Sequence, residues 1–433
     1  MNRVQRLVIA ALLASLAAPS PAFAQSTVAA VSPAADSASA LDAFYLSRNQ
    51  APLWLKDDAG RAAAQALSAA LRNSAVDGFA GGTDLAAEVD GALARSQPAD
   101  DRIISAAWIR YVQALSAPVE GINYGDPALS LKAPPPALIL ARLSAAPSAI
   151  DLVNRTSAVN PLYSALRDAA VQAGAADDPR VQATLARLRL IPAKGRAILV
   201  DSAAAELWML EDGRPVDSMK VVVGKTVSPT PLLAGTIHYV TFNPFWHIPD
   251  DVARKRVAPV VIKRGVSYLK AARYETSETY SAQSPRVDPA TIDWKGVAAG
   301  TTPVFIRQLP GGQNMMGAMK FSFDNDQDIF LHDTPKDKLH QALFAKTQRT
   351  YSMGCIRLER ADRLARWLLG RDPTAPSDEP EQHVQVDGGV PVFVSYLTAN
   401  VADGKLVFAD DVYRLDPAPA AVASAAAPVV TSN

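Results

Sequence analysis

Hydrophobic positions in the first half of the chain recur at helical spacing. Residues 62–72 have this period, and residues 161–173 resume it after three helix-breaking prolines at 134–136. Between residues 102 and 116, apolar residues three and four positions apart share one helix face: Ile104, Ala107, Trp108, Tyr111 and Leu115. Residues 41–185 are therefore predicted to form an α-helical domain.

The second half changes to short runs of β-type residues separated by turn residues. Asp212 and Gly213 stand between two of these runs, which is a strong hairpin signal. The predicted strands are residues 197–200, 206–210, 219–223, 236–242, 304–306, 329–332, 392–396 and 406–408. Many short strands indicate a sandwich-like or barrel-like domain. The predicted fold class is α+β, a helical domain followed by a mainly-β, β-sandwich-like domain over residues 190–413.

Three segments differ in composition from these two domains. Residues 25–40 are rich in Ala, Ser and Pro and are predicted to be a flexible linker. Residues 250–300 are charged, Tyr-rich and irregular, which indicates an insertion within the β-domain. Residues 414–433 are predicted to be a disordered tail.

The first 24 residues have the pattern of a secretory signal. Arg3 and Arg6 precede an apolar stretch over residues 7–18, and Ala22-Phe23-Ala24 fits a small-x-small cleavage pattern. The stretch is short for a bilayer span. We therefore expect export with cleavage, and an uncleaved anchor is the alternative.

Charge and residue spacing argue against several function classes. The chain has 43 basic and 43 acidic residues, so no bulk charge favours nucleic acid as a partner. No set of His, Cys and carboxylate residues has metal-ligand spacing. We therefore predict neither a metal nor a cofactor.

Cys355 is the only cysteine, and an exported chain with one cysteine cannot form an internal disulfide. Such a thiol forms an intermolecular disulfide, is buried and inert, or is reactive. His332 precedes it with 22 residues between them, and a histidine can take a thiol proton and return it to a leaving amine. On these residues alone, inert burial remains an alternative.

The residues around Cys355 add further candidate chemistry. Gly354 lets a carbonyl approach the backbone, and its amide and that of Cys355 are candidate oxyanion donors. Arg357 is a candidate for holding a substrate carboxylate, and a structural ion pair is the alternative. The apolar spacing of residues 358–368 predicts a helix that stops at Gly370. Its positive N-terminal end is expected to favour the thiolate.

Two blocks of sequence resemble the L,D-transpeptidase family, which has the YkuD-type catalytic domain. They are Ser-x-Gly-Cys-Ile-Arg at residues 352–357 and Leu-His-Asp-Thr-Pro at residues 331–335. The sequence is similar to the branch of this family in Gram-negative bacteria whose members are larger and carry an N-terminal scaffold domain. The similarity extends over about residues 190–413, including Phe-Asn-Pro-Phe-Trp-His-Ile-Pro at residues 242–249, and more weakly over the helices.

The resemblance implies roles for the residues of these blocks. Cys355 matches the family's nucleophile and His332 its general acid/base, while Ser352 and Gly354 line the same site. Arg357 matches the arginine that follows the cysteine. The resemblance further implies a periplasmic, cell-wall-associated enzyme of the kind that carbapenems acylate.

The implied reaction forms 3–3 cross-links between peptidoglycan stem peptides. A tetrapeptide stem acylates the cysteine, its terminal D-alanine leaves, and the side-chain amine of a second stem attacks the thioester. An L,D-carboxypeptidase using water and an inactive wall-binding protein are the alternatives. A lysine of an outer-membrane protein and a free D-amino acid are alternative acceptors.

The sequence departs from the family pattern at several positions. The spacing from His332 to Cys355 is longer than usual, and the extra stretch contains His340, a rival base. Met353 stands where many members have histidine, and Phe330 stands where tyrosine is usual. The 250–300 insertion is expected to act as a cap, with His247 a candidate at its border.

Overall fold

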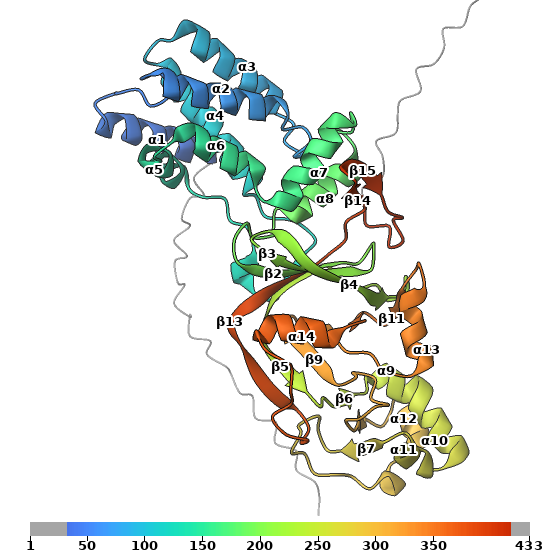
Figure 1. The fold of residues 1–433 in the computed structure, drawn as a ribbon. Helices are drawn as coiled ribbons and strands as arrows, with labels where there is room; N and C mark the ends of the chain where they lie inside the picture. The colour runs from blue at the N-terminus through green and yellow to red at the C-terminus, as the bar shows by residue number, and fades with distance from the viewer. Residues whose placement is uncertain (1–32, 417–433) are drawn as a thin grey trace, which may run out of the picture.

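The computed structural model describes residues 33–416. Figure 1 shows a helical region at one end, a β-domain in the middle and the inserted segment at the other end. The helical region is formed by α1 (Pro33–Ser47), α2 (Asp58–Arg72), α3 (Gly82–Arg95), α4 (Asp100–Leu115), α5 (Pro136–Ala145), α6 (Ala149–Ala158), α7 (Pro161–Gln172) and α8 (Pro179–Leu188). Helices α1 to α6 share one apolar core, and α7 and α8 pack instead against the β-domain.

A buried carboxylate ties the start of the helical region together. Asp101, in the first turn of α4, accepts the amides of Leu53, Trp54 and Leu55 at 2.7–2.8 Å. It also accepts the hydroxyl of Tyr45 at 2.6 Å. Because a buried charge needs several partners to offset its desolvation, these bonds fix the α1–α2 loop against α4.

The structure differs from the sequence prediction at the expected linker. Helix α1 begins at Pro33, inside the stretch 25–40 that was predicted to be flexible. Alanine has the highest helix propensity, and proline fits the first helical position, so this Ala-rich stretch continues into a helix. Residues 25–32, the predicted signal and the tail from 417 onward lie outside the described residues. Within residues 33–416, no helix is long and apolar enough to cross a membrane.

The strands of the β-domain close into a ring. The order is β5–β13–β2–β3–β4–β12–β10–β9, and β9 pairs back to β5. The strands of the ring are β2 (Arg196–Asp201), β3 (Glu206–Glu211), β4 (Arg214–Gly224), β5 (Leu233–Phe242), β9 (Met319–Phe323), β10 (Phe330–His332), β12 (Ile356–Leu358) and β13 (Gln382–Ser395). Two short strands join the ring by parallel pairing, β1 (Asn123–Tyr124) on β5 and β11 (Thr350–Ser352) on β4. The predicted α+β class, helices followed by a mainly-β domain, is confirmed.

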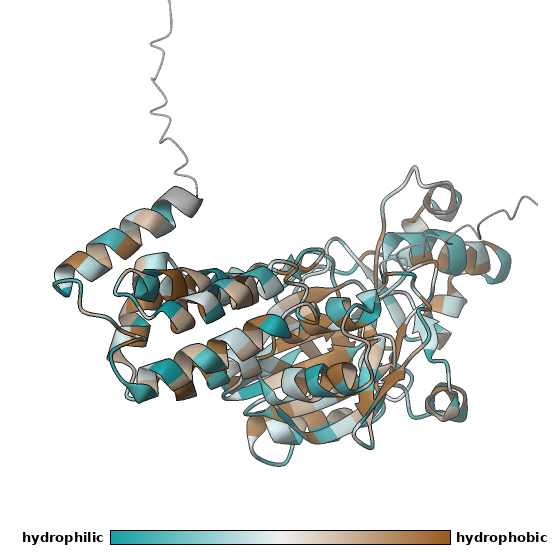
Figure 2. Cartoon of the chain, turned by 90° about the horizontal axis from the view of Figure 1, so that it is seen from above, coloured by the Kyte–Doolittle hydropathy of each residue, from teal (hydrophilic) through white to brown (hydrophobic). Residues whose placement is uncertain are grey.

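Alternation along the strands separates two cores. Ile198 and Val200 of β2 point into the ring, whereas Ala197 and Leu199 pack outward against α7 and α8. Figure 2 shows the hydrophobic residues concentrated on these strands. The predicted hairpin at residues 212–213 is also confirmed, since both residues have positive φ between β3 and β4.

The helix expected after Cys355 is present as α14 (Ala361–Leu369), followed by Gly370 with φ of 64°. Its apolar face enters the core of the ring through Ala361, Leu364, Ala365 and Leu368. The chain around Cys355 is therefore held between this core and the strands of the ring. A hairpin of β14 (Ala399–Ala402) and β15 (Lys405–Phe408) ends the fold beside α7.

The inserted segment is ordered, whereas the sequence predicted irregular structure. It has its own apolar core and a three-stranded sheet in the order β6–β8–β7. We call residues 246–308 the inserted subdomain. Its elements are β6 (Trp246–His247), α9 (Asp250–Val252), the π-helical turn Ala253–Val257, α10 (Ala258–Arg264), α11 (Ser267–Ala271), β7 (Tyr274–Ser277), α12 (Trp294–Ala299) and β8 (Phe305–Gln308). The charged residues mark its surface, and the apolar residues between them form its core.

Asp201, at the end of β2, makes the β-domain sensitive to pH. Burial raises the pKa of its carboxyl to about 7. One oxygen accepts the amides of Ala203 and Leu397 at 3.0 Å, and the other is buried without a partner. The folded protein therefore holds a proton that the unfolded chain loses near pH 4, so stability falls as pH rises from there through about 7.

We predict that Asp201→Asn, which mimics the protonated carboxyl, removes this loss. In the window up to about pH 7, each pH unit costs the wild type up to about 1.4 kcal/mol relative to the variant. Thermal unfolding of both proteins at pH 5 and pH 8 measures the difference. From pH 5 to pH 8, the Tm of the variant should rise relative to the Tm of the wild type. Equal changes of Tm in the two proteins would contradict the prediction.

Candidate active site

Strands β10 and β12 bring the segments that carry His332 and Cys355 side by side. They pair in parallel, with Leu331 beside Ile356 and His332 beside Arg357. Leu331 and Ile356 point into the core, so His332 and Arg357 lie on the opposite face. Cys355 directly precedes β12 in a bend, two positions before Arg357, and is packed partly against the core of the ring. The strand pairing therefore brings the segment of Cys355 next to the segment of His332.

The longer stretch after His332 does not disturb this register. The extra residues fold into α13 (Lys338–Gln341) and a 3-10 turn over Ala342–Ala345 before β11 begins. His340 lies in α13, where its Nδ1 is 2.6 Å from the carboxylate of Asp337, the N-cap of that helix. The rival histidine is thus engaged locally, and His332 is the histidine whose strand pairs with the strand that follows Cys355.

His332 is buried and neutral. Its Nδ1 lies 2.7 Å from the carbonyl oxygen of Asp333. A carbonyl only accepts, so Nδ1 carries the hydrogen and Nε2 keeps its lone pair. Burial, and then the charges of Arg357 and Lys320, lower the pKa of His332 to about 3. The ring therefore stands ready as a base at Nε2 throughout the neutral range.

Cys355 rests as a thiol. Burial raises the pKa of its half-buried side chain, and the Phe330 amide and Arg357 offset only part of this. The S–H group points to the carbonyl of Asp328, at 3.6 Å. The expected thiolate is therefore wrong for the resting site, because β12 separates the thiol from the first residue of α14 at Ala361.

Ser352 and Gly354 shape the turn before the nucleophile. Gly354 has φ of +120°, a conformation that favours glycine. Its amide donates to Ser352 Oγ at 3.1 Å, and its carbonyl accepts from Thr230 Oγ1 at 2.7 Å. The Gly354 amide is thus already bonded, which corrects the expectation of two free oxyanion donors. No local pattern indicates this bond of Thr230, because it spans 124 positions.

Two cations flank His332 on neighbouring strands. His332 stands in register with Arg357 on β12 and with Lys320 on β9. Arg357 is largely buried, burial lowers the pKa of its guanidinium, and its Nε has no hydrogen-bond partner. Among the ion pairs formed by residues 33–416, none includes Arg357 or Lys320, so the structural ion pair considered for Arg357 is absent there. Sequence reasoning assigned no role to Lys320, a charged residue inside an apolar strand.

His247 of the inserted subdomain lies on the Lys320 side of the site. Its ring stacks on Tyr280 at 4.9 Å and lies 6.3 Å from Phe245. Its Nε2 is buried without a partner, and burial, followed by the charge of Lys320, lowers the pKa of the ring. The subdomain thus contributes an aromatic and imidazole surface to the surroundings of Lys320.

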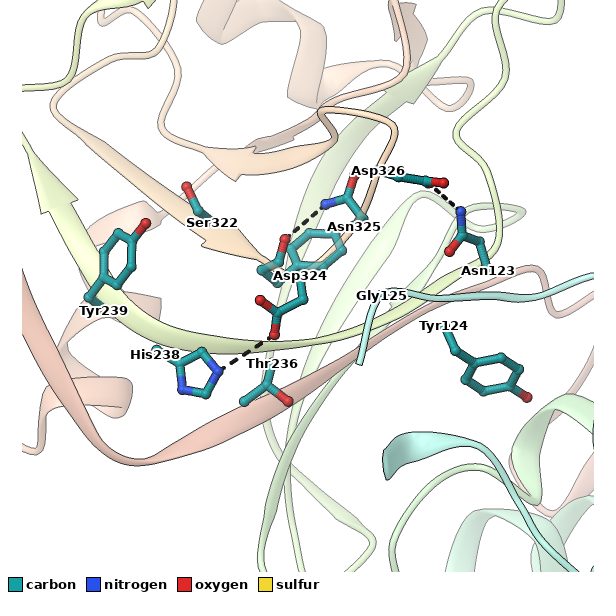
Figure 3. A pocket seen from close by; sticks show the side chains of 11 residues that line it. Asn123, Tyr124, Gly125, Thr236, His238, Tyr239, Ser322, Asp324, Asn325 and Asp326 are labelled. Carbon is teal, nitrogen blue, oxygen red and sulfur yellow. Dashed lines mark hydrogen bonds and ion pairs between the residues drawn. The ribbon is translucent and has the colours of Figure 1, made fainter. Parts of the chain in front are cut away.

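A hollow of about 520 Å³ lies beside the loop that precedes β10 (Figure 3). It is lined by residues 123–125, by part of β5 and by residues 322–326. Neither His332 nor Cys355 lines it, so the hollow is not the catalytic site. Within residues 33–416, no cluster of His, Cys, Asp and Glu has the arrangement of a metal site.

Comparison with known proteins agrees with this arrangement. Residues 195–394 match the YkuD model, the L,D-transpeptidase catalytic domain, and residues 39–169 match the scaffold domain model. A protein from Haemophilus influenzae described as a putative L,D-transpeptidase is 26% identical over 389 residues, covering 86% of this chain and 77% of the relative.

Two solved structures show a more distant similarity. The Ldtfm–avibactam carbamoyl enzyme is 14% identical with a TM-score of 0.23, covering 48% of this chain and 50% of that one. An L,D-transpeptidase from Mycobacterium smegmatis is 12% identical with a TM-score of 0.22, covering 46% and 58%. The matched regions thus span only about half of those chains. The chain thus contains a YkuD-type L,D-transpeptidase catalytic domain behind an N-terminal scaffold domain.

Proposed function

We propose that this protein is a periplasmic L,D-transpeptidase that forms 3–3 cross-links between peptidoglycan stems by Cys–His acyl transfer. The observation that supports this most is the pairing of β10 with β12, which brings the segments of His332 and Cys355 together, with Nε2 of His332 left to accept a proton. A thiol and a neutral imidazole form a competent nucleophile and base pair. The family match supports the substrate class.

The first half of the reaction forms a thioester. Cys355 Sγ attacks the carbonyl carbon of the third stem residue while its proton passes to Nε2 of His332. The C–N bond to the terminal D-alanine then breaks, and the leaving amine takes that proton from Nε2. Because both partners are neutral at rest, proton transfer accompanies the attack and does not precede it.

The second half reverses these proton movements. The side-chain amine of a second stem attacks the thioester carbon, and Nε2 of His332 takes a proton from the amine. The C–S bond breaks and the proton returns to Sγ, which restores the resting thiol. Water in place of the amine would release a tripeptide, so the carboxypeptidase reaction uses the same residues.

Arg357 and Lys320 are expected to bind the donor stem and to set the pKa of His332. Stem peptides carry free carboxylates, and Arg357 and Lys320 are unpaired cations on either side of His332. A guanidinium binds a carboxylate in a bidentate, charge-assisted manner. Bound carboxylates would also offset two of the charges that lower the pKa of His332, so substrate binding would strengthen the base.

The inserted subdomain is proposed to act as a cap over the bound stem. Its His247 and Tyr280 stack lies on the Lys320 side of the site. A cap that excludes water would favour an amine over water as the thioester acceptor. The balance between transfer and hydrolysis is therefore expected to depend on this subdomain.

We predict that the full chain converts tetrapeptide muropeptides into 3–3 linked dimers and that Cys355→Ala abolishes this product. Mass spectrometry of the products measures both. The conservative control is Met353→Ala, because this neighbouring side chain is exposed and is expected to leave the dimer yield unchanged. Tripeptide monomers alone would indicate hydrolysis, and dimers formed by Cys355→Ala would overturn the assignment.

The acid side of the pH profile should lack an ordinary histidine titration. The imidazole of His332 is the active form above its pKa, and that pKa is lowered to about 3. We therefore expect kcat/KM, which reports the free enzyme, to show no fall between pH 7 and pH 5. A loss of activity centred near pH 6.5 would contradict a neutral, buried His332.

We predict that Lys320→Met raises KM for tetrapeptide stems by about 10- to 100-fold, the effect of losing one charge-assisted bond. Lys405→Met is the matched control, since Lys405 is exposed on β15, outside the catalytic sheet. Loss of Lys320 should also raise the pKa of His332, because Lys320 is one of the charges that lower it. An unchanged KM in Lys320→Met would remove Lys320 from the substrate site.

A further inference from the structure

A loop of the helical region contributes a strand to the catalytic sheet. Residues 123–126 lie between α4 and α5 and contain β1, which pairs with β5 through Asn123 beside Leu233 and Tyr124 beside Ala234. The amide of Asp126 donates to the carbonyl of Ala234 at 3.3 Å, and its carboxylate accepts from Thr236 at 2.8 Å. We call residues 123–126 the scaffold arm.

The scaffold arm also presses against the loop between β9 and β10. Figure 3 shows the side-chain amide of Asn123 directed at Asp326, to which it donates a hydrogen bond of 2.5 Å. Gly125 lies against the backbone of Asp324, so that a Cβ at position 125 would sit 1.8 Å from the Asp324 carbonyl oxygen. Because that neighbour is backbone, only glycine allows the arm to lie this close.

The loop that receives the arm is internally stiff. Asn325 accepts the amides of Gln327 and Ile329 through Oδ1, at 3.1 and 3.0 Å. Its Nδ2 donates to the carbonyls of Phe323 and Ile329 at 2.9 Å. Four bonds from one side chain make residues 323–329 a unit that is expected to move as one piece.

The far end of the same loop holds the catalytic turn. The carbonyl of Asp328 accepts the S–H of Cys355 at 3.6 Å. The side chain of Ile329 packs over Gly354, with its Cδ1 only 2.9 Å from where a Cβ of residue 354 would lie. A stiff loop thus has the scaffold arm at one end and the nucleophile at the other.

We propose that the scaffold domain positions the catalytic thiol through this arm, with Asn123 and Gly125 as positioning residues. The inference rests on the proposed function only in taking Cys355 as the nucleophile. It gives the scaffold domain a direct role in the reaction, although its own helices carry no catalytic side chain.

Loosening the scaffold arm is expected to raise the reactivity of the Cys355 thiol and to lower turnover. Burial is the main cause that raises the pKa of Cys355, and a carbonyl that accepts the S–H also stabilises the thiol, so retreat of the loop with Asp328 lowers that pKa. The thiolate fraction near neutral pH then rises. Turnover falls at the same time, because the sulfur is no longer held in the productive position beside His332.

The test compares Gly125→Ala and Asn123→Ala with the wild type as full chains. Cys355 is the only cysteine, so the rate of alkylation by iodoacetamide between pH 6 and pH 10 reports this thiol alone. For Gly125→Ala we expect alkylation at pH 7 to be about tenfold faster and turnover of tetrapeptide muropeptides about 10- to 100-fold slower. Asn123→Ala should shift both quantities in the same directions by less.

Gly312→Ala is the matched control, since nothing lies within 4 Å of a Cβ at that position and its φ is not positive. It should keep the wild-type alkylation profile and turnover. Folded arm variants with the wild-type alkylation profile would overturn the proposal, whatever their turnover. If Gly125→Ala does not fold, Asn123→Ala decides by the same criterion. A wild type that is alkylated but forms no products would refute the proposed function and leave the alkylation test of the arm valid.

Discussion

The active site depends on the parallel pairing of two strands that have only three residues each. Neither β10 nor β12 would hold its register alone. β9 pairs with β10 on one side, β4 pairs with β12 on the other, and the ring is closed by β9 on β5. Because side chains alternate, a slip of one residue would turn Leu331 or Ile356 out of the core. The closed ring is therefore what holds the segments of Cys355 and His332 next to each other.

This placement has an electrostatic consequence. Burial disfavours charge on both partners, and Arg357 and Lys320 further disfavour a protonated His332. The resting site is thus a neutral pair held next to unpaired cations. An anionic stem peptide would relieve that imbalance on binding, so under the proposed function the strongest base forms only when substrate is present.

Much of this was predictable from the sequence. The strand and helix patterns gave the α+β class, the hairpin at residues 212–213 and the helix after Cys355, because these depend on local periodicity and turn chemistry. The motif blocks marked Cys355 and His332, whose segments the structure brings together through the pairing of β10 with β12.

The parts that the sequence did not predict are set by contacts between distant residues. Thr230 reaches Gly354 across 124 positions, and Asn123 reaches Asp326 across 203. The raised pKa of Cys355 follows from burial, which no local pattern records. The order of residues 250–300 was missed because its small apolar core is dispersed among charged residues.

The central claim is that His332 is a neutral base with its hydrogen on Nδ1. Nitrogen-15 NMR of the histidine rings tests it most directly, with His332→Gln identifying the signal among the five histidines. The account predicts a protonated Nδ1 and a bare Nε2 for His332, unchanged from pH 8 down to pH 5. A ring that becomes doubly protonated near pH 6.5, or one that carries its hydrogen on Nε2, would contradict it.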